Sequence, residues 1–323
     1  MTNKINLAVV GCGGWGKNLI RNFFELGVLF SVCDENDKIA KKYSQKYNIK
    51  NLSFIETINH PDISGVVLAV PAQLHSPMAI KAINKGKHVF IEKPLSTNME
   101  EAIMINNALK KNNTKLMVGH LLQFHPIFKK ILRIVRAGEI GKLLYIKSSR
   151  LSLGKVRSKE DIVWSFAPHD VSMILSLVGE DPDIVSTNSI SILKKGIADI
   201  ANIHMQFKSG LKSDVSVSWF NANKEVKLEV YGSNGILIFD DTKTWNEKLA
   251  IHPYKVMYKN KEIEIEKSYL KYFQIPEEEP LKIECQHFIN IQKYDIEPLT
   301  DIKEGMRVVS VLSAASKSYK DLT

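Results

Sequence analysis

A glycine-rich turn follows the first apolar run of the chain, residues 5–10. The turn has the pattern G-x-G-x-x-G over residues 11–16, and a helical stretch follows it. The first glycine of this pattern permits a tight turn, the second lets a pyrophosphate approach the backbone, and the third lets helix and strand pack closely. The turn therefore predicts a dinucleotide site. The residues expected to contact the cofactor are Gly11, Cys12, Gly13, Gly14, Trp15 and Gly16.

An acidic residue, Asp34, ends the second apolar run at residues 28–33. The pyrophosphate is expected on the unpaired N–H groups at the start of the intervening helix. A carboxylate in the position of Asp34 accepts hydrogen bonds from a ribose diol and repels a 2′-phosphate. We therefore expect NAD rather than NADP. The alternative is a glycine-rich turn in an α/β protein of another kind.

The motif Glu92-Lys93-Pro94 stands at the end of another apolar run, residues 88–91. Ligands of doubly wound sheets bind at the carboxyl ends of the strands. Partial desolvation and a nearby nicotinamide would lower the pKa of a lysine there. Such a lysine can hold a substrate hydroxyl and stabilise the alkoxide that forms as hydride leaves. We predict a catalytic role for Lys93, whereas the alternative is a surface lysine near a turn.

Apolar runs and helical patterns alternate up to about residue 120. Near-continuous apolar strands separated by helices indicate a parallel sheet that is covered on both faces. This pattern predicts a doubly wound Rossmann domain over residues 1–121. The expected strands are 5–10, 28–33, 63–70, 88–91 and 115–118, and the expected helices are 17–26, 37–47, 74–84, 97–111.

The pattern changes after residue 122. Alternating runs at 200–207 and 211–219, and again at 226–231 and 236–239, flank short glycine-containing turns. Such pairs are typical of antiparallel hairpins. Residues 122–323 are therefore expected to form an α+β domain with a large, mainly antiparallel open sheet. Its expected helices are 127–135, 168–178, 281–292 and 302–319.

The charge, apolar content and cysteines of the chain indicate which kinds of binding partner and cell compartment to expect. The chain has 323 residues and a formal net charge of +9, but its lysines are spread along the chain without an arginine-rich stripe, which argues against a nucleic-acid partner. This charge can still attract a polyanionic substrate. No apolar run reaches the roughly 18–20 residues that span a bilayer. The first apolar stretch runs into the glycine turn without a small-residue cleavage site, so we expect no signal peptide. The three cysteines form no CxxC pair, and a cytoplasmic protein is expected.

Histidines at positions 75, 120, 125 and 169 invite a metal-site interpretation. His120 and His125 are five residues apart on no common helix face and lack an acidic or cysteine partner. We therefore expect no metal. His120 ends a strand and is better interpreted as lining the cofactor or substrate pocket.

The glycine turn, residues 69–75 and Glu92-Lys93-Pro94 resemble the glucose–fructose oxidoreductase, inositol dehydrogenase and rhizopine catabolism (Gfo/Idh/MocA) family. Residues 302–309 are similar to the final helix of the family. The resemblance implies a sugar or cyclitol dehydrogenase or reductase whose active site lies between the two domains. It also implies a homodimer or homotetramer through the large sheet. The further cofactor contacts that it implies are Pro71, His75, Glu92, Lys93, His120 and Gln123.

The family usually places a histidine on a helix of the second domain, with an aspartate four residues earlier. His169 matches the histidine, but Ser165 replaces the aspartate. An imidazole can act as general base toward a sugar hydroxyl; the alternative is a structural histidine. Ser165 is expected to cap the helix, with Pro168 in its first turn. Asp170 either orients the imidazole or favours the helix dipole.

Residues 119–126 and 164–170 resemble family members that oxidise the 3-hydroxyl of a UDP-linked N-acetylhexosamine. This resemblance implies UDP-N-acetylglucosamine rather than its uronic acid, with an aminotransferase acting on the keto product. The expected substrate contacts are Lys93, Arg157, Trp164, His169 and Asp170. For Arg157 a surface ion pair, and for Trp164 plain core packing, are the alternatives. Other functions left open are a dehydrogenase or ketoreductase for UDP-N-acetylglucosaminuronate, a free sugar or a cyclitol, and a non-catalytic NAD-binding regulator.

Overall fold

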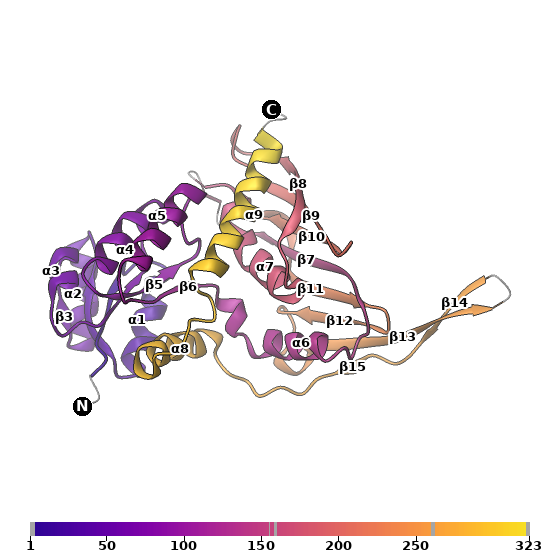
Figure 1. The fold of residues 1–323 in the computed structure, drawn as a ribbon, viewed down its shortest axis with the longest axis horizontal. Coiled ribbons are helices and arrows are strands. Elements are labelled where there is room, and N and C mark those ends of the chain that lie inside the picture. Colours follow the sequence, from indigo (N-terminus) through magenta and orange to yellow (C-terminus); the bar gives the residue numbers. More distant parts are fainter. Residues whose placement is uncertain (1–3, 155, 158–159, 260–261, 321–323) are drawn as a thin grey trace. The chain divides into compact units, whose positions relative to one another are not determined.

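The computed structural model describes residues 4–154, 156–157, 160–259 and 262–320. The chain divides into two compact units (Figure 1). The first unit contains Met1–Phe124 and Glu279–Ser310, and the second contains His125–Glu278 and Val311–Thr323.

The first unit is built on a parallel sheet of six strands within the described residues, in the order β3-β2-β1-β4-β5-β6. The central strands β1 and β4 are buried at every position, as expected where helices cover both faces of a sheet. The predicted doubly wound domain is confirmed. The strands are β1 Leu7–Val10, β2 Leu29–Cys33, β3 Lys50–Asn51, β4 Gly65–Leu68, β5 His88–Glu92 and β6 Leu116–Gly119.

Several helices of this unit begin at a side-chain cap. Asn98 caps α5 by accepting a hydrogen bond of 2.9 Å from the backbone N–H of Glu101. Ser53 and Glu56 form a capping box at α3, a helix that was not expected. The elements are α1 Gly16–Glu25, α2 Asp37–Tyr47, α3 Phe54–Asn59, η1 Ala72–Leu74, α4 His75–Ile83, α5 Met99–Lys110 and η2 Leu121–Phe124.

Helix α8 (Pro280–Tyr294) returns to the first unit, so a division at residue 121 is wrong for this part of the chain. Phe288 of α8 is fully buried and packs edge-on against Phe23 and Phe90, at ring-centroid distances of 6.4 and 5.8 Å. Arg21 also pairs with Glu279, just before α8. A helical pattern shows which residues are apolar but not which core receives them, and this explains the error.

The second unit contains a sheet of nine strands in the described part of the chain, in the order β14-β13-β12-β11-β7-β10-β9-β8, with β15 paired to β13. All described pairings are antiparallel except β7 with β10. Both predicted hairpins, β9–β10 and β11–β12, are present. The strands are β7 Leu143–Leu153, β8 Pro182–Ile190, β9 Ile200–Phe207, β10 Lys212–Ser218, β11 Phe220–Gly232, β12 Gly235–Asp240, β13 Leu249–Lys259, β14 Glu262–Lys267 and β15 Lys271–Tyr272.

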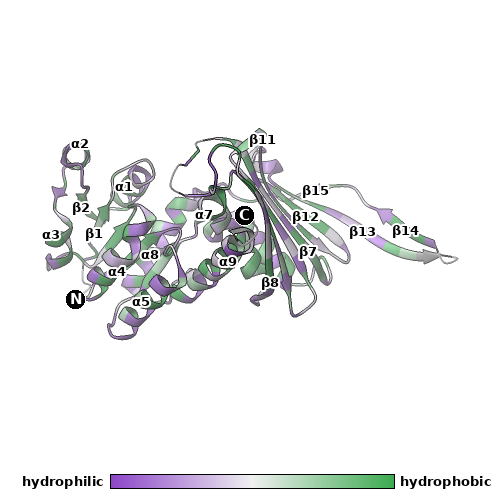
Figure 2. Ribbon diagram, turned by 90° about the horizontal axis from the view of Figure 1, so that it is seen from above, coloured by the Kyte–Doolittle hydropathy of each residue, from purple (hydrophilic) through white to green (hydrophobic). Residues whose placement is uncertain are grey.

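Helix α7 (Ile162–Val178) packs on one face of this sheet, and no described helix lies on the other face (Figure 2). Helix α6 (Pro126–Arg136) contacts α7 and β12. Strands β13 and β14 continue beyond the rest of the sheet as an exposed two-stranded arm (Figure 1). Helix α9 (Ile302–Lys320) begins in the first unit and ends in the second.

Candidate cofactor and catalytic site

The three glycines of the turn have the geometry that a dinucleotide site needs. Gly11 adopts a φ of +94°, and a Cβ there would lie 2.4 Å from the carbonyl oxygen of Ala69. A Cβ at Gly16 would lie 1.8 Å from the carbonyl oxygen of Gly11, so only glycine permits this helix to pack against the turn. A Cβ at Gly13 would meet no described atom within 4 Å, which leaves its backbone open to a ligand.

Asp34 is fixed by two backbone donors. Its Oδ2 accepts a hydrogen bond of 2.7 Å from the N–H of Cys12, and its Oδ1 accepts one of 2.9 Å from the N–H of Asn36. The Cys12 thiol itself is buried, and burial with nearby Asp34 raises its pKa to about 12. Cys12 therefore contributes its backbone to the turn, and its thiol stays protonated.

A pocket of about 400 Å³ opens at the carboxyl ends of β1, β2 and β4. Asp34 and Pro71 line it as expected, together with Gly11 and Gly13. Apolar walls from Phe54, Leu74 and Met78 suit a flat adenine, while the carboxylate of Asp34 suits a ribose diol. The residues present therefore fit NAD. Sequence patterns missed the three wall residues, although the capping box before Phe54 was a usable signal.

The glycine turn also reaches the end of β5. The indole Nε1–H of Trp15 donates a hydrogen bond of 2.5 Å to Oε1 of Glu92, and the N–H of Lys93 lies 3.3 Å from Oε2. Burial raises the pKa of Glu92 to about 7, although Trp15 and Lys93 act in the opposite direction. Lys93 is half-buried at the carboxyl end of the sheet. The first unit therefore brings Trp15, Glu92 and Lys93 together.

His75 lies inside the first unit, with a backbone carbonyl oxygen close to each of its ring nitrogens. It is 1% exposed, with Nδ1 at 2.7 Å from the carbonyl oxygen of Pro94 and Nε2 at 2.9 Å from that of Val70. Burial lowers its pKa. The first residue of α4 therefore turns inward and links the loop after β4 to the loop after β5.

His120 and Gln123 are both buried as well. His120 Nδ1–H donates a hydrogen bond of 2.6 Å to the carboxylate of Glu304 on α9. The side chain of His120 is only 1% exposed. Glu304 belonged to the family-like final helix, but sequence patterns assigned it no part in a site.

A buried carboxyl group on α8 was also missed. Glu284 is 0% exposed, and neither of its carboxyl oxygens has a hydrogen-bond partner among the described residues. Burial and the nearby Glu92 raise its pKa well above the ordinary value, so the group is held protonated.

In the second unit, His169 lies in the middle of α7 and is half-buried. The helix begins at Ile162, and Asp161 caps it by accepting a hydrogen bond of 3.1 Å from the N–H of Trp164. Ser165 is therefore not the cap that was expected, and Pro168 lies in the helix interior. The helix starts early because Asp161 satisfies its first-turn donors.

Two expected substrate contacts have structural partners instead. Both oxygens of Asp170 accept hydrogen bonds from Arg150, and one also accepts from Ser148, so this carboxylate faces the sheet rather than His169. Trp164 Nε1–H donates a hydrogen bond of 2.8 Å to Ser316 Oγ on α9, which favours the packing alternative. Arg157 is exposed, and its Nε lies 4.0 Å from Oε2 of Glu160.

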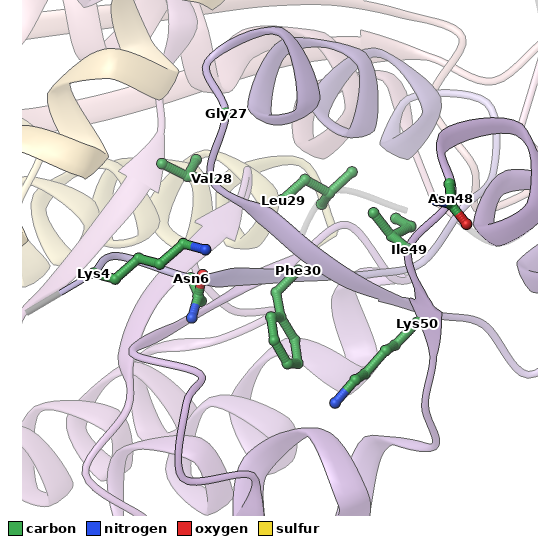
Figure 3. Close-up of a pocket in the computed structure, with 9 residues that line it drawn as sticks. All are labelled: Lys4, Asn6, Gly27, Val28, Leu29, Phe30, Asn48, Ile49 and Lys50. Carbon is green, nitrogen blue, oxygen red and sulfur yellow. The ribbon is translucent and has the colours of Figure 1, made fainter.

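A second pocket, of about 470 Å³, opens at the amino ends of β1 and β2, the opposite end from the glycine turn (Figure 3). Lys4 and Lys50 lie on its lining with Phe30. The Lys50 ammonium lies 4.6 Å from the centre of the Phe30 ring. This pocket is therefore separate from the predicted cofactor site.

Among the described residues, no group of three or more His, Cys, Asp or Glu side chains has the arrangement of a metal site. Across the same residues, no helix combines the length and apolar character needed to cross a membrane.

Comparison with known families decides the family. The model described as "Oxidoreductase family, NAD-binding Rossmann fold" matches residues 5–120, and the model of the GFO/IDH/MocA C-terminal domain matches residues 128–238. The chain belongs to the Gfo/Idh/MocA oxidoreductase family. The predicted family, α/β fold, enzyme class and NAD cofactor are confirmed.

Relatives within the Gfo/Idh/MocA family act on different substrates. The scyllo-inositol 2-dehydrogenase (NAD(+)) of Bacillus subtilis (strain 168) is 28% identical and covers 73% of each chain. The UDP-N-acetylglucosamine 3-dehydrogenase of Acidithiobacillus ferrooxidans is 24% identical over 65% of this chain and 66% of its own. A solved structure of the latter enzyme, GnnA, has a TM-score of 0.85, 20% identity and 97% coverage of each chain.

Proposed function

We propose that this oxidoreductase uses NAD to oxidise the 3-hydroxyl of a UDP-N-acetylhexosamine, most specifically UDP-N-acetylglucosamine, to the 3-keto sugar. The observation that carries the substrate class is the resemblance of residues 119–126 and 164–170 to nucleotide-sugar members of the family. Similarity to a UDP-N-acetylglucosamine 3-dehydrogenase in sequence and in fold supports it.

In this proposal, His169 and Lys93 have separate roles in the oxidation of the 3-hydroxyl. His169 accepts the proton of the 3-hydroxyl as general base. The ammonium of Lys93 donates a hydrogen bond to the same oxygen and stabilises its developing negative charge. NAD, when bound, supplies the acceptor for the hydride that leaves C3. Glu92 holds the backbone N–H of Lys93 and so helps to orient the lysine.

The diphosphate of the substrate needs positive charge. Arg157 is exposed, and its planar guanidinium suits a diphosphate. The excess of lysine and arginine over acidic residues, 44 against 35, also favours a polyanionic substrate. A diphosphate bound far from C3 provides binding energy that positions the hydroxyl for reaction.

An inositol or free sugar is the second candidate substrate. The scyllo-inositol 2-dehydrogenase of Bacillus subtilis and a myo-inositol 2-dehydrogenase of Thermotoga maritima, 26% identical, favour it. Incubation with NAD and a panel of UDP-sugars, free sugars and inositols separates the two, with NADH absorbance and the keto product as readouts. An aminotransferase that removes the keto product belongs in the assay, because oxidation of an alcohol by NAD is unfavourable at neutral pH.

The proposal has three further parts. A cytoplasmic location fits the three unpaired, buried cysteines. An aminotransferase that converts the keto product to a 3-amino sugar for a surface glycan such as lipopolysaccharide is the expected partner in metabolism. The sheet face of the second unit that no described helix covers is the expected surface for a homodimer or homotetramer.

A further inference from the structure

A buried ion pair ties helix α7 to strand β7 one residue after His169. Arg150 Nε donates a hydrogen bond of 2.7 Å to Asp170 Oδ2, and Arg150 Nη2 donates one of 3.1 Å to Oδ1. Ser148 Oγ donates a third, of 2.6 Å, to Oδ1. The side chains of Asp170 and Arg150 are 2% and 18% exposed. Two hydrogen bonds between a guanidinium and a carboxylate fix the relative orientation of the two groups as well as the distance between them.

A proline interrupts the backbone hydrogen bonds of α7 close to this ion pair. Pro168 lies inside α7 and has no N–H to donate to the carbonyl group four residues earlier. The intrahelical ladder is therefore interrupted directly before His169. A turn weakened in this way would let the imidazole change direction, unless another contact holds the backbone.

We propose that Arg150, through Asp170, is a positioning residue that fixes the direction of His169 for proton abstraction. This inference rests on the proposed function, because it assigns His169 the role of general base. Arg150 and Asp170 touch neither substrate nor cofactor in this proposal, and they act only through the helix turn that carries His169.

The charges around the pair are close to balanced. Burial alone would lower the pKa of Arg150, but Asp170 and, more weakly, Asp241 raise it. Asp241 in turn pairs with Lys248 and lies 4.0 Å from His125 Nε2. Burial lowers the pKa of His125 to about 4, so that ring is neutral at pH 7. Removing one partner of the Arg150–Asp170 pair therefore leaves one unbalanced charge at the helix turn that carries His169.

Because the charges of Arg150 and Asp170 compensate each other, removing either one should change the pKa of His169 in a predictable direction. In Asp170→Asn, the positive charge of Arg150 is uncompensated and disfavours the imidazolium, so the pKa of His169 falls. In Arg150→Gln, the carboxylate of Asp170 is uncompensated, and the pKa of His169 rises. Titration of His169 by NMR measures both changes without any activity. Shifts in opposite directions are expected, whereas equal shifts or no shift in both variants would overturn the proposal.

A second experiment measures kcat and the Kd for NAD in a conservative variant and in a matched control. Arg150→Lys keeps the charge but loses the two-point geometry. We expect its kcat to fall about tenfold or more, with the Kd for NAD unchanged, because cofactor contacts lie in the first unit.

The control is Asp199→Asn. Asp199 is an equally buried carboxylate of the second unit, and it accepts hydrogen bonds from Trp219 Nε1, Ile192 N and Leu193 N.

We expect Asp199→Asn to lower stability while leaving kcat near that of the wild type. An equal loss of kcat in the control and in Arg150→Lys would reduce the pair to a structural contact and overturn the proposal. Failure of the proposed function is recognised separately, because the wild type would then fail to oxidise the UDP-sugar, while the opposite NMR shifts of His169 in the two charge variants would remain.

Discussion

The indole of Trp15 and the carboxyl group of Glu92 join the two motifs of the first unit by a hydrogen bond of 2.5 Å. The glycine turn and the end of β5 are 77 residues apart in sequence, yet this bond places them on one site. The carboxyl group that accepts the bond is half-buried, and its desolvation raises its pKa to about 7. The charge of Glu92 therefore changes near neutral pH, beside Lys93.

Glu92 should make the protein less stable as the pH rises from about 4.5 to 7. Its pKa in the folded state is raised above its unfolded value of about 4.3. The folded state thus keeps a proton that the unfolded state releases, and stability is lost by up to about 3 kcal/mol across that window. Glu92→Gln should flatten the curve of unfolding free energy against pH. Urea titrations at pH 5, 6 and 7 test this.

Glu262→Gln is the control for this measurement, because Glu262 is exposed on β14. Its curve should parallel that of the wild type. Parallel curves for Glu92→Gln as well would mean that the Glu92 carboxyl is ionised in the folded protein from low pH upward.

Asp34 should set the preference for NAD. Asp34→Ser combined with Glu35→Arg removes the carboxylate that faces the ribose and adds a partner for a 2′-phosphate. We expect the Kd for NAD to rise about tenfold and NADP binding to improve. Calorimetric titrations with both cofactors measure the change, with Glu35→Arg alone as the control. Tighter binding of NADP than of NAD by the wild type would refute the assignment of Asp34.

His169→Asn should lower turnover by about 10²–10⁴-fold, the usual contribution of a general base. NAD binding should stay near that of the wild type, because the pocket lined by Asp34 lies in the first unit. Stopped-flow turnover and equilibrium NAD binding separate the two effects. Turnover close to that of the wild type would exclude His169 as the base and point to Lys93.

The sequence predicted those features of the fold and site that depend on short, local residue patterns. Residues 11–16 form the tight turn that their glycines predicted, and Asp34 follows β2 beside that turn. The early start of α7 was missed because Pro168 resembles a first-turn proline, while the cap at Asp161 outweighed it.

Tertiary contacts explain the other differences. Nothing in the sequence around His75 shows that Pro94 and Val70 occupy both of its ring nitrogens. The pairing of Asp170 with Arg150 likewise depends on how α7 packs against β7. Side chains that looked available for ligands were in these cases satisfied by distant parts of the chain.

The most direct test compares UDP-N-acetylglucosamine with free N-acetylglucosamine in steady-state kinetics with NAD. In the proposed mechanism, binding energy from the diphosphate positions C3, so loss of the UDP group should reduce kcat as well as affinity. We predict a clear preference for the nucleotide sugar in both kcat and kcat/KM, with a product oxidised at C3. Equal efficiency on the free sugar, or a preference for myo-inositol or glucose, would contradict the proposed substrate.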